Sequence, residues 1–216
     1  MSGPPQLELS VTGAEPVPHA AGPTMRFRLE ARDESGRDVY TVALCAQIHL
    51  EPGKRPYGEA EIERLGDLFG ARERWPATTR PFLWSRVDVL VPSFAGSTEF
   101  DLLLACTYDH EIAAAKYLAS LDGGDVPVAF HFSGSVMYRG DGGGLQIVQV
   151  PWESSASYPL PVDVWRAMIE SHYPNSGWVR LHADTLAELR SLATERGLPS
   201  LEACVLELLA ERGGVS

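Results

Sequence analysis

The densest group of side chains able to do chemistry is a short run, Asp109-His110-Glu111. A histidine between two carboxylates can ligate a metal ion or transfer a proton. However, adjacent residues on a helix point in different directions, and no HxxxH or HExxH spacing accompanies this run. Acidic residues also stabilise the positive N-terminus of a helix, and Asp109 is a suitable N-cap. The run therefore supports two interpretations, a reactive cluster and a helix start, and we favour the helix start.

Two further histidines, His49 and His131, lie on predicted strands, each on the polar face opposite an apolar alternation. If these two faces meet, the histidines can form a metal site together with Asp109 or His110. The HxH pair of cupin-like metal sites is missing, and solitary strand histidines are more often surface or hydrogen-bonded residues. A metal-binding or small-molecule-binding site built from His49, His110, His131 and Asp109 is therefore the alternative interpretation, and no cofactor is expected.

Large aromatic residues beside arginine, lysine or proline recur along the chain. Such aromatic and arginine anchors form binding hot spots in protein interfaces, although they also hold long loops against a core. Lys54 and Arg55 stand just beyond a predicted strand end in an otherwise acidic chain. We predict a partner-binding surface that includes these side chains: Lys54, Arg55, Tyr57, Arg74, Trp75, Trp84 and Trp152.

The motifs of common catalytic sites are missing from the sequence. The string nearest to a Gly-x-Ser-x-Gly nucleophile elbow, residues 132–136, lacks the first glycine and falls within a predicted strand. Residues 140–144 are rich in glycine but have no Lys-Ser/Thr and no following helix, so a hairpin turn explains them better than a phosphate loop. We therefore lean towards a protein without enzymatic activity.

The first two-thirds of the chain shows the period-two alternation of β-strands, punctuated by turns. The longest alternation runs from Val39 to Leu50 and is typical of a strand half buried in an antiparallel sheet. Strands are predicted over 6–11, 25–31, 39–50, 85–91, 99–107, 127–139 and 145–150, with helices over 58–69 and 109–119. The predicted fold class is therefore α+β, an antiparallel β-sandwich of about seven or eight strands with inserted helices and a C-terminal helical portion.

The last third of the chain is predicted to be mainly helical. Helices are predicted over 161–172, over 185–196 and from Ser200 onwards, after a turn-rich stretch over 154–161. A proline at the first position, a capping box and a serine cap mark their three starts. The last helix carries a wide apolar stripe that must pack against another surface. We therefore divide the chain into a sandwich domain, 1–152, and a helical region packed on it, 153–216.

The charge balance excludes two classes of partner. The 216 residues carry 18 lysines and arginines against 29 aspartates and glutamates, a formal net charge of −11. Such a chain lacks the basic field that attracts nucleic acids and anionic membranes, so neither is expected as a partner. No apolar run is long enough for membrane insertion, and no secretory signal is recognisable. The scattered Cys45, Cys106 and Cys204 fit buried free thiols of a cytoplasmic protein.

Several short strings over residues 5–210 carry a resemblance to a known family. They are Gln47-Ile48, Arg55-Pro56-Tyr57, Leu68-Phe69-Gly70, Arg74-Trp75, Trp84, Tyr108-Asp109, Phe132-Ser133-Gly134, Val150-Pro151-Trp152, Leu160-Pro161-Val162 and Trp165. On these strings the chain resembles a bacterial family of unknown function, common in actinobacteria, whose genes often lie beside those of nickel–iron uptake hydrogenases. The resemblance implies an accessory or assembly role. No catalytic residue is established for the family, so it implies none here.

Three functional hypotheses follow. The first is a cytoplasmic, non-enzymatic interaction protein, such as a scaffold or assembly factor of a hydrogenase system; the sequence lacks the cysteine clusters that would hold an iron–sulfur centre. The second is a β-sandwich that binds a metal ion or small molecule through its strand histidines. The third is a structural protein whose final helix pairs with a copy of itself. The expected partner is a protein, either a hydrogenase subunit or a second copy of the chain.

Overall fold

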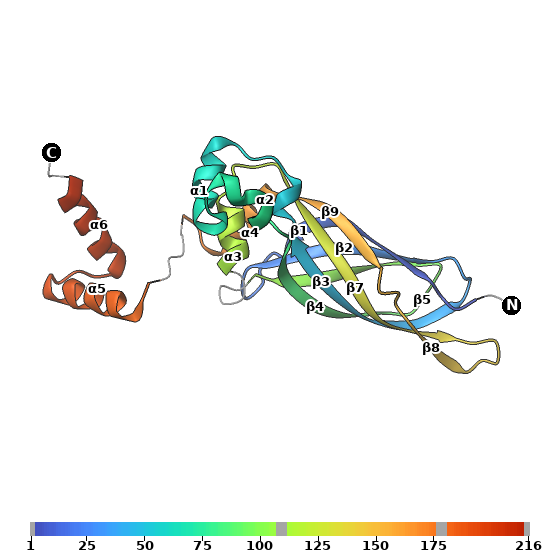
Figure 1. Cartoon of the computed structure of the whole chain (residues 1–216). Coiled ribbons are helices and arrows are strands. Elements are labelled where there is room, and N and C mark those ends of the chain that lie inside the picture. The colour runs from blue at the N-terminus through green and yellow to red at the C-terminus, as the bar shows by residue number, and fades with distance from the viewer. Residues whose placement is uncertain (1–2, 107–111, 176–180, 214–216) are drawn as a thin grey trace. The chain divides into compact units, whose positions relative to one another are not determined.

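The computed structural model describes residues 3–106, 112–175 and 181–213. Within these ranges, nine strands form two antiparallel sheets, and six α-helices accompany them (Figure 1). The two sheets face each other as in a sandwich, and their facing sides share one apolar core. The predicted α+β fold with an antiparallel sandwich is confirmed.

The smaller sheet has the order β1-β2-β6, with antiparallel pairing throughout. Its strands are β1 (Leu7–Pro16), β2 (Thr24–Asp33) and β6 (Ser97–Ala105). Along β2, every second side chain from Met25 to Ala31 is completely buried, while the residues between them lie on the outer side. The period-two pattern of the sequence therefore sets which side of this sheet faces the core.

The larger sheet has the order β4-β3-β7-β8, and β5 and β9 pair with β3 and β7. Its strands are β3 (Asp38–Leu50), β4 (Phe82–Val91), β5 (Phe94–Ala95), β7 (Asp125–Arg139), β8 (Leu145–Gln149) and β9 (Ser155–Pro161). The 15-residue β7 pairs with β3 along one edge, and with β8 and β9 in succession along its other edge. β3 and β7 are therefore the central strands of this sheet.

A group of aromatic side chains joins the two sheets. Phe27 of β2 packs edge-on against Trp84 of β4, Phe130 of β7 and Tyr158 of β9, with ring centroids 6.2, 5.1 and 6.3 Å apart. Edge-to-face contacts at these separations stabilise a core beyond the burial of area alone. The core therefore runs continuously from the smaller sheet into the larger one.

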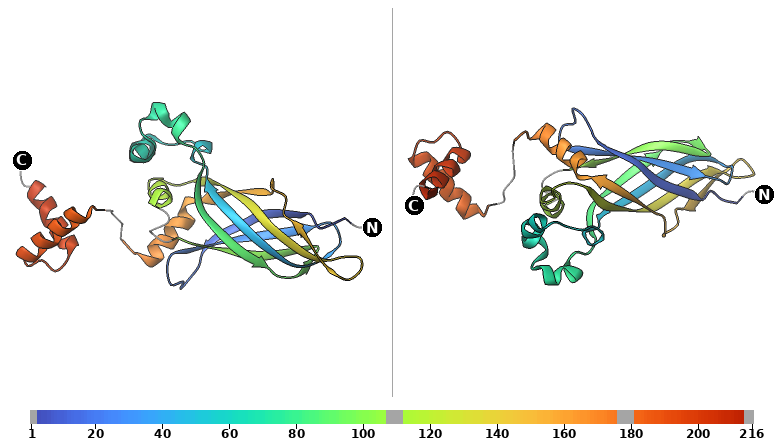
Figure 2. Two further views of the ribbon diagram at one scale, coloured as in Figure 1. Left: turned by 60° about the horizontal axis from the view of Figure 1, so that its bottom comes forward. Right: turned by 90° about the horizontal axis from the view of Figure 1, so that it is seen from above.

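Helices gather at one end of the sandwich (Figures 1 and 2). They are the 3-10 turn η1 (Pro52–Lys54), α1 (Glu59–Phe69), the turn η2 (Arg72–Arg74) and α2 (Trp75–Thr78) between β3 and β4, then α3 (Ile112–Ala119) before β7 and α4 (Val162–His172) after β9. Gly70 ends α1, as predicted, with a φ of 76° that favours glycine. α4 contacts β1, β2 and β9 and so covers this end of the sandwich.

Three predictions for the last third of the chain were wrong. The stretch over 154–161, predicted as turns, is largely the strand β9, paired with the start of β7. Its prolines misled the prediction, although an edge strand tolerates proline because its outer N–H groups need no partner. Pro161 is the N-cap of α4 and precedes its first helical residue. Helix α5 begins at Ala183, ahead of the predicted capping box at Thr185.

The chain divides into two compact units, Met1–Pro174 and Asn175–Ser216, whereas the sequence-based division falls after residue 152. The first unit holds both sheets and α1 to α4. The second holds α5 (Ala183–Glu195) and α6 (Leu201–Gly213), and the Ser200 hydroxyl accepts a hydrogen bond at the start of α6, which confirms the predicted serine cap. None of the helices described here has the length and apolarity needed to cross a membrane.

Candidate functional site

Arg55, predicted as part of a partner-binding surface, is buried where η1 meets α1. Its Nη2 lies 3.1 Å from Glu61 Oε1, and the two side chains are only 10% and 6% exposed. Nη2 also donates to the Gly123 carbonyl at 3.2 Å, and the Glu61 carboxylate accepts the backbone N–H groups of Gly58 and Asp122, each at 2.9 Å. This buried ion pair therefore ties α1 to the loop that precedes β7.

Tyr57 and Trp75 belong to the same buried group. The Tyr57 hydroxyl donates to the Pro52 carbonyl and shares a hydrogen bond with the Tyr117 hydroxyl, each at 2.8 Å. The Trp75 ring packs edge-on against Tyr57 and Phe69, at 5.2 and 5.6 Å between centroids. Burial raises the pKa of both tyrosines, so their hydroxyls stay protonated. We name this group the helical clamp: Arg55, Tyr57, Glu61, Trp75 and Tyr117.

The other predicted anchors are divided between the interior and the surface. Trp84 is 3% exposed and lies between the two sheets. Lys54 and Arg74 are exposed, and Lys54 pairs with Glu51 at 2.8 Å. Trp152, in the turn between β8 and β9, is 90% exposed. Of the predicted partner-binding residues, Lys54, Arg74 and Trp152 are therefore the ones open to a partner, while the others make internal contacts.

The structure brings together two of the predicted metal-ligating residues. His49 on β3 and His131 on β7 occupy diagonal positions of paired strands, and their ring centroids lie 5.2 Å apart. Burial, and then the neighbouring His131, lowers the pKa of His49. Asp109 and His110 lie outside the described residues. Across the residues that are described, no three His, Cys, Asp or Glu side chains converge as metal ligands would.

The outer side of the larger sheet carries the predicted His49 and His131, but the rest of its surface was not predicted as a site. Its register sets Ala43 of β3 between Leu90 of β4 and Ser135 of β7, and sets Ser135 beside Gln149 of β8. Leu90 is 74% exposed and Ile147 of β8 is 59% exposed, although both are apolar. We name this surface the uncharged face: Ala43, Cys45, Leu90, Ser133, Ser135, Met137, Ile147 and Gln149.

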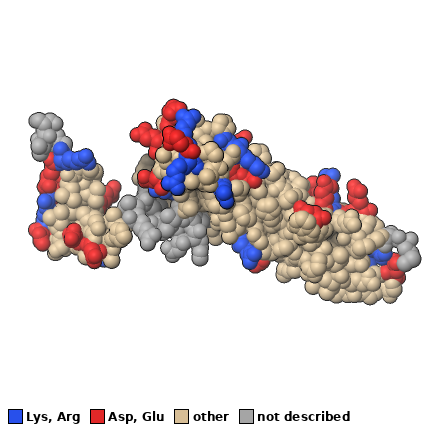
Figure 3. All heavy atoms as spheres, viewed as in Figure 1, with Lys and Arg blue, Asp and Glu red and all other residues tan. Residues whose placement is uncertain are grey.

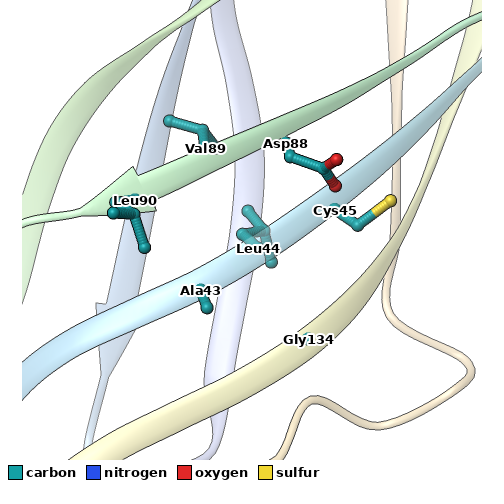
Figure 4. A pocket seen from close by; sticks show the side chains of 7 residues that line it. All are labelled: Ala43, Leu44, Cys45, Asp88, Val89, Leu90 and Gly134. Carbon is teal, nitrogen blue, oxygen red and sulfur yellow. The ribbon is translucent and has the colours of Figure 1, made fainter.

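A shallow hollow of about 290 Å³ lies where the uncharged face meets β4, and Asp88 lines it together with Ala43, Cys45 and Leu90 (Figure 4). A Cβ at Gly134 would collide with the carbonyl oxygen of Ala43, so glycine is required where β7 passes β3. Burial raises the pKa of the Cys45 thiol, and a hydrogen bond with Asp88 adds to the effect. Cys45 therefore stays a neutral thiol, a poor nucleophile. The hollow offers a binding shape without an activated reactive group.

The outer side of the smaller sheet has the opposite character. Arg26 of β2 pairs with Glu15 of β1 at 3.0 Å and with Asp101 of β6 at 3.2 Å, and Arg32 pairs with Glu30 at 2.8 Å. In Figure 3, acidic and basic side chains crowd over the helices of the first unit, and an uncharged stretch covers much of the strands. On the outer side of the smaller sheet the charges are joined in ion pairs, whereas on the larger sheet Arg86 and Asp88 of β4 stand beside uncharged residues of β3 and β7.

The sequence contains a signal for the uncharged face, namely a scarcity of charged residues. A search for motifs does not find such a scarcity, because it looks for residues that are present. Residues 126–138 contain no Lys, Arg, Asp or Glu, and residues 145–161 contain only Glu153, although 22% of the chain is charged. The small and weakly polar residues of these segments match no catalytic or binding motif. Strand pairing in the larger sheet brings these residues together into one surface.

Comparisons with known proteins assign a family. A family model described as a family of unknown function, DUF6084, matches residues 4–215. No curated protein matches the chain. Among solved structures, a β-glucosidase from Kluyveromyces marxianus is similar at 7% identity and a TM-score of 0.30, over 72% of this chain and 15% of its own. The ApaA protein from Bordetella pertussis is similar at 14% identity and a TM-score of 0.29, over 73% and 95%. Structural likenesses this weak carry no argument about function.

Proposed function

The chain belongs to the DUF6084 family, and we propose that it is a non-enzymatic accessory protein that binds a protein partner through the uncharged face. The observation that carries the proposal is the exposure of Leu90 and Ile147, two large apolar side chains, at 74% and 59% on the uncharged face. Large apolar side chains left exposed on a sheet are typical of interaction sites, and these two lie on β4 and β8, on either side of the central strands β3 and β7. In a chain of net charge −11, the absence of Lys, Arg, Asp and Glu from residues 126–138 and their near absence from residues 145–161 favour a docking role for the strands that these segments form.

The rim of the uncharged face supplies suitable interface residues. Asp88 and Arg86 lie on the outer side of β4, and Trp152 follows β8 closely and is 90% exposed. An exposed tryptophan beside a neutral surface is a typical hot-spot residue, and charged residues at the rim set orientation and association rate. We expect the partner to present an apolar centre with charges around it.

We further propose a subunit of a nickel–iron hydrogenase system as the partner, with binding in the cytoplasm and a role as scaffold or assembly factor. This part of the proposal rests on the family resemblance of the sequence. A broad sheet surface with exposed apolar side chains suits a protein partner better than a small substrate, which supports a partner of this class.

The test measures binding of the full-length chain to purified hydrogenase large and small subunits by biolayer interferometry. Leu90→Glu and Ile147→Glu each place a charge in the uncharged face and should weaken binding by about tenfold or more. Leu103→Glu is the matched control, because Leu103 is 50% exposed on the outer side of the smaller sheet. Its affinity should equal that of the unmodified chain.

Two results would contradict the proposal. If neither hydrogenase subunit binds, the partner assignment is wrong. If Leu103→Glu weakens binding as much as Leu90→Glu does, the uncharged face is not the docking surface. Thermal unfolding of each variant separates loss of binding from loss of folding.

The pairing of His49 with His131 favours a second candidate function, metal or small-molecule binding. Titration calorimetry with Ni²⁺ and Zn²⁺ tests the metal form of it, because imidazole is a ligand for both ions. Stoichiometric binding should disappear in His49→Asn and in His131→Asn. His19→Asn is the control, since His19 is exposed and has a positive φ of 59° that asparagine also adopts. Absence of binding by the unmodified chain would exclude a site for these two ions.

A further inference from the structure

The second compact unit, Asn175–Ser216, buries little of its own apolar surface. Among its described residues only Ala193 and Cys204, both small, are buried, while Val205 and Leu209 are 41% and 57% exposed. Units of roughly 40 residues usually need a disulfide, a metal ion or a partner to be stable. Cys204 is a free thiol. The apolar surface of this unit therefore needs another surface to pack against.

Contacts within the unit use only one side of α6. The Cys204 sulfur lies 3.8 Å from the Leu189 carbonyl of α5. Arg196, just after α5, pairs with Glu207 at 3.0 Å and with Glu211 at 2.6 Å. These contacts hold α5 and α6 together as a hairpin of two 13-residue helices. Apart from Glu211, the exposed residues of α6 lie on its remaining surface.

On that remaining surface, with Leu206, 60% exposed, beside them, four exposed residues of α6 form a stripe: Glu202, Val205, Leu209 and Arg212. Their spacing of three, four and three residues is that of a coiled-coil seam, and at 100° per residue they fall within about 80° of arc. The apolar pair is central, and opposite charges stand at the two ends. Among the described residues, neither Glu202 nor Arg212 has an ion-pair partner.

We propose that α6 pairs with α6 of a second copy of this chain, antiparallel, along this stripe. The stripe has the same spacing when read in reverse, so a two-fold axis through its middle sets Val205 opposite Leu209 of the second copy. The same axis sets Glu202 opposite Arg212 of the second copy at both ends. The apolar centre is thereby covered, and each terminal charge meets its opposite. This is the self-complementarity that a two-fold interface requires.

The charge pattern is the reason for choosing a second copy as the occupant. Two chains of net charge −11 repel each other, so their association requires local complementarity. A stripe that is acidic at one end and basic at the other matches its own reversed copy. The proposal goes beyond the proposed function, because dimerisation through α6 leaves the uncharged face of each chain unused. A dimer would then present two such faces and bind a multivalent partner with avidity.

The experiment is sedimentation equilibrium of the full-length chain over a wide range of concentration. We expect a monomer–dimer equilibrium. Glu202→Lys and Arg212→Glu each turn two attractive pairs into repulsive pairs, so each should raise the dissociation constant by about tenfold. The double variant Glu202→Lys/Arg212→Glu exchanges the two charges and should return the constant close to its original value. That rescue distinguishes a direct pairing from a general loss of stability.

Two further variants complete the test. Val205→Asp/Leu209→Asp should be monomeric, and Leu103→Asp, on the outer side of the smaller sheet, should dimerise normally. A chain that stays monomeric at all concentrations would overturn the proposal. So would a dimer that survives Val205→Asp/Leu209→Asp, or a double charge variant that does not recover. Leu90→Glu should leave dimerisation intact, so failure here is distinguishable from failure of the docking proposal.

Discussion

The helical clamp and the uncharged face use opposite kinds of residue for opposite purposes. The clamp contains the arginine, tyrosines and tryptophan that are typical of binding hot spots, yet their contacts lie inside the molecule. The uncharged face combines alanine, serines and a cysteine, half-buried on the central strands except for the exposed Ser133, with the exposed Leu90 and Ile147 on the flanking strands. Arginine, tyrosine and tryptophan therefore indicate a strong contact. Whether that contact is made within the chain or with a partner depends on whether these side chains are buried.

The clamp has a structural reason to use such residues. The segment between β3 and β4 contains two short turns and two helices, and much of its backbone lacks sheet partners. The Arg55 guanidinium and the Glu61 carboxylate supply donors and acceptors to backbone groups of Gly58, Asp122 and Gly123. Buried backbone groups need such partners, since an unpaired one destabilises the fold.

The largest expected effect tests the clamp. Glu61→Ala leaves the buried Arg55 unpaired and two N–H groups without acceptors, and should lower the free energy of unfolding by about 3–5 kcal/mol. Urea denaturation measures it. Glu59→Ala is the control on the same helix, because its pair with Arg72 is 85% and 62% exposed and should contribute little. Similar losses in both variants would contradict the burial of the clamp.

The next effect tests the strand contact beneath the uncharged face. Gly134 has a φ of 151°, and a Cβ there would collide with the Ala43 carbonyl oxygen. Gly134→Ala should therefore destabilise the fold by about 3 kcal/mol, measured by thermal and urea unfolding. Gly13→Ala in β1, with no atom within 4 Å of the added Cβ, is the control and should stay close to the unmodified chain. A tolerated Gly134→Ala would show that β3 and β7 can separate without cost.

A smaller effect concerns the tyrosine pair of the clamp. Tyr57→Phe removes the hydrogen-bond partner of the fully buried Tyr117 hydroxyl and should destabilise the fold by about 1–2 kcal/mol. Tyr40→Phe is the control, because Tyr40 is 66% exposed on β3. Neither variant should change partner binding, whereas Leu90→Glu should change binding without a comparable loss of stability. If Tyr57→Phe weakened partner binding, or Leu90→Glu lowered stability as much as it weakened binding, the helical clamp and the uncharged face would not have separate roles.

The smallest expected effect is a pH dependence of the stability of the fold, caused by His49 on the outer side of the larger sheet. Because burial lowers the pKa of His49 in the folded chain, the unfolded chain binds the proton more readily. Stability should be constant above about pH 6.5, the ordinary histidine pKa, and fall as the pH decreases below it. Denaturation midpoints between pH 7.5 and 5 measure the slope. His49→Asn should reduce it, and His19→Asn should not.

Much of the fold was predictable because the evidence for it is local. The alternation from Val39 to Leu50 identified a strand and its buried side, and the glycines at 142–144 identified the turn between β7 and β8. β9 was missed because its prolines and serines resemble a turn and only pairing with β7 makes it a strand. The start of α5 was misplaced because the capping box lies inside the helix.

The candidate site was less predictable than the fold. His49 and His131 were expected on outward faces, and their contact depends on the pairing of β3 with β7. Arg55 and Trp75 were predicted as partner-binding residues, with the anchoring of long loops as the alternative, because aromatic residues beside arginine and proline fit both roles. Their burial follows from the folding of α1 and α2 over the sandwich end, which no local pattern encodes.

The sequence by itself determined which side chains of each strand face inwards, since that depends on a period of two along the backbone. It also determined the stripe of Glu202, Val205, Leu209 and Arg212, since helical spacing places them on one side. Only the tertiary structure decided that Ala43, Leu90, Ser135 and Ile147 share one surface. These residues come from four strands, and hydrogen-bonded pairing between strands far apart in the chain selects their neighbours.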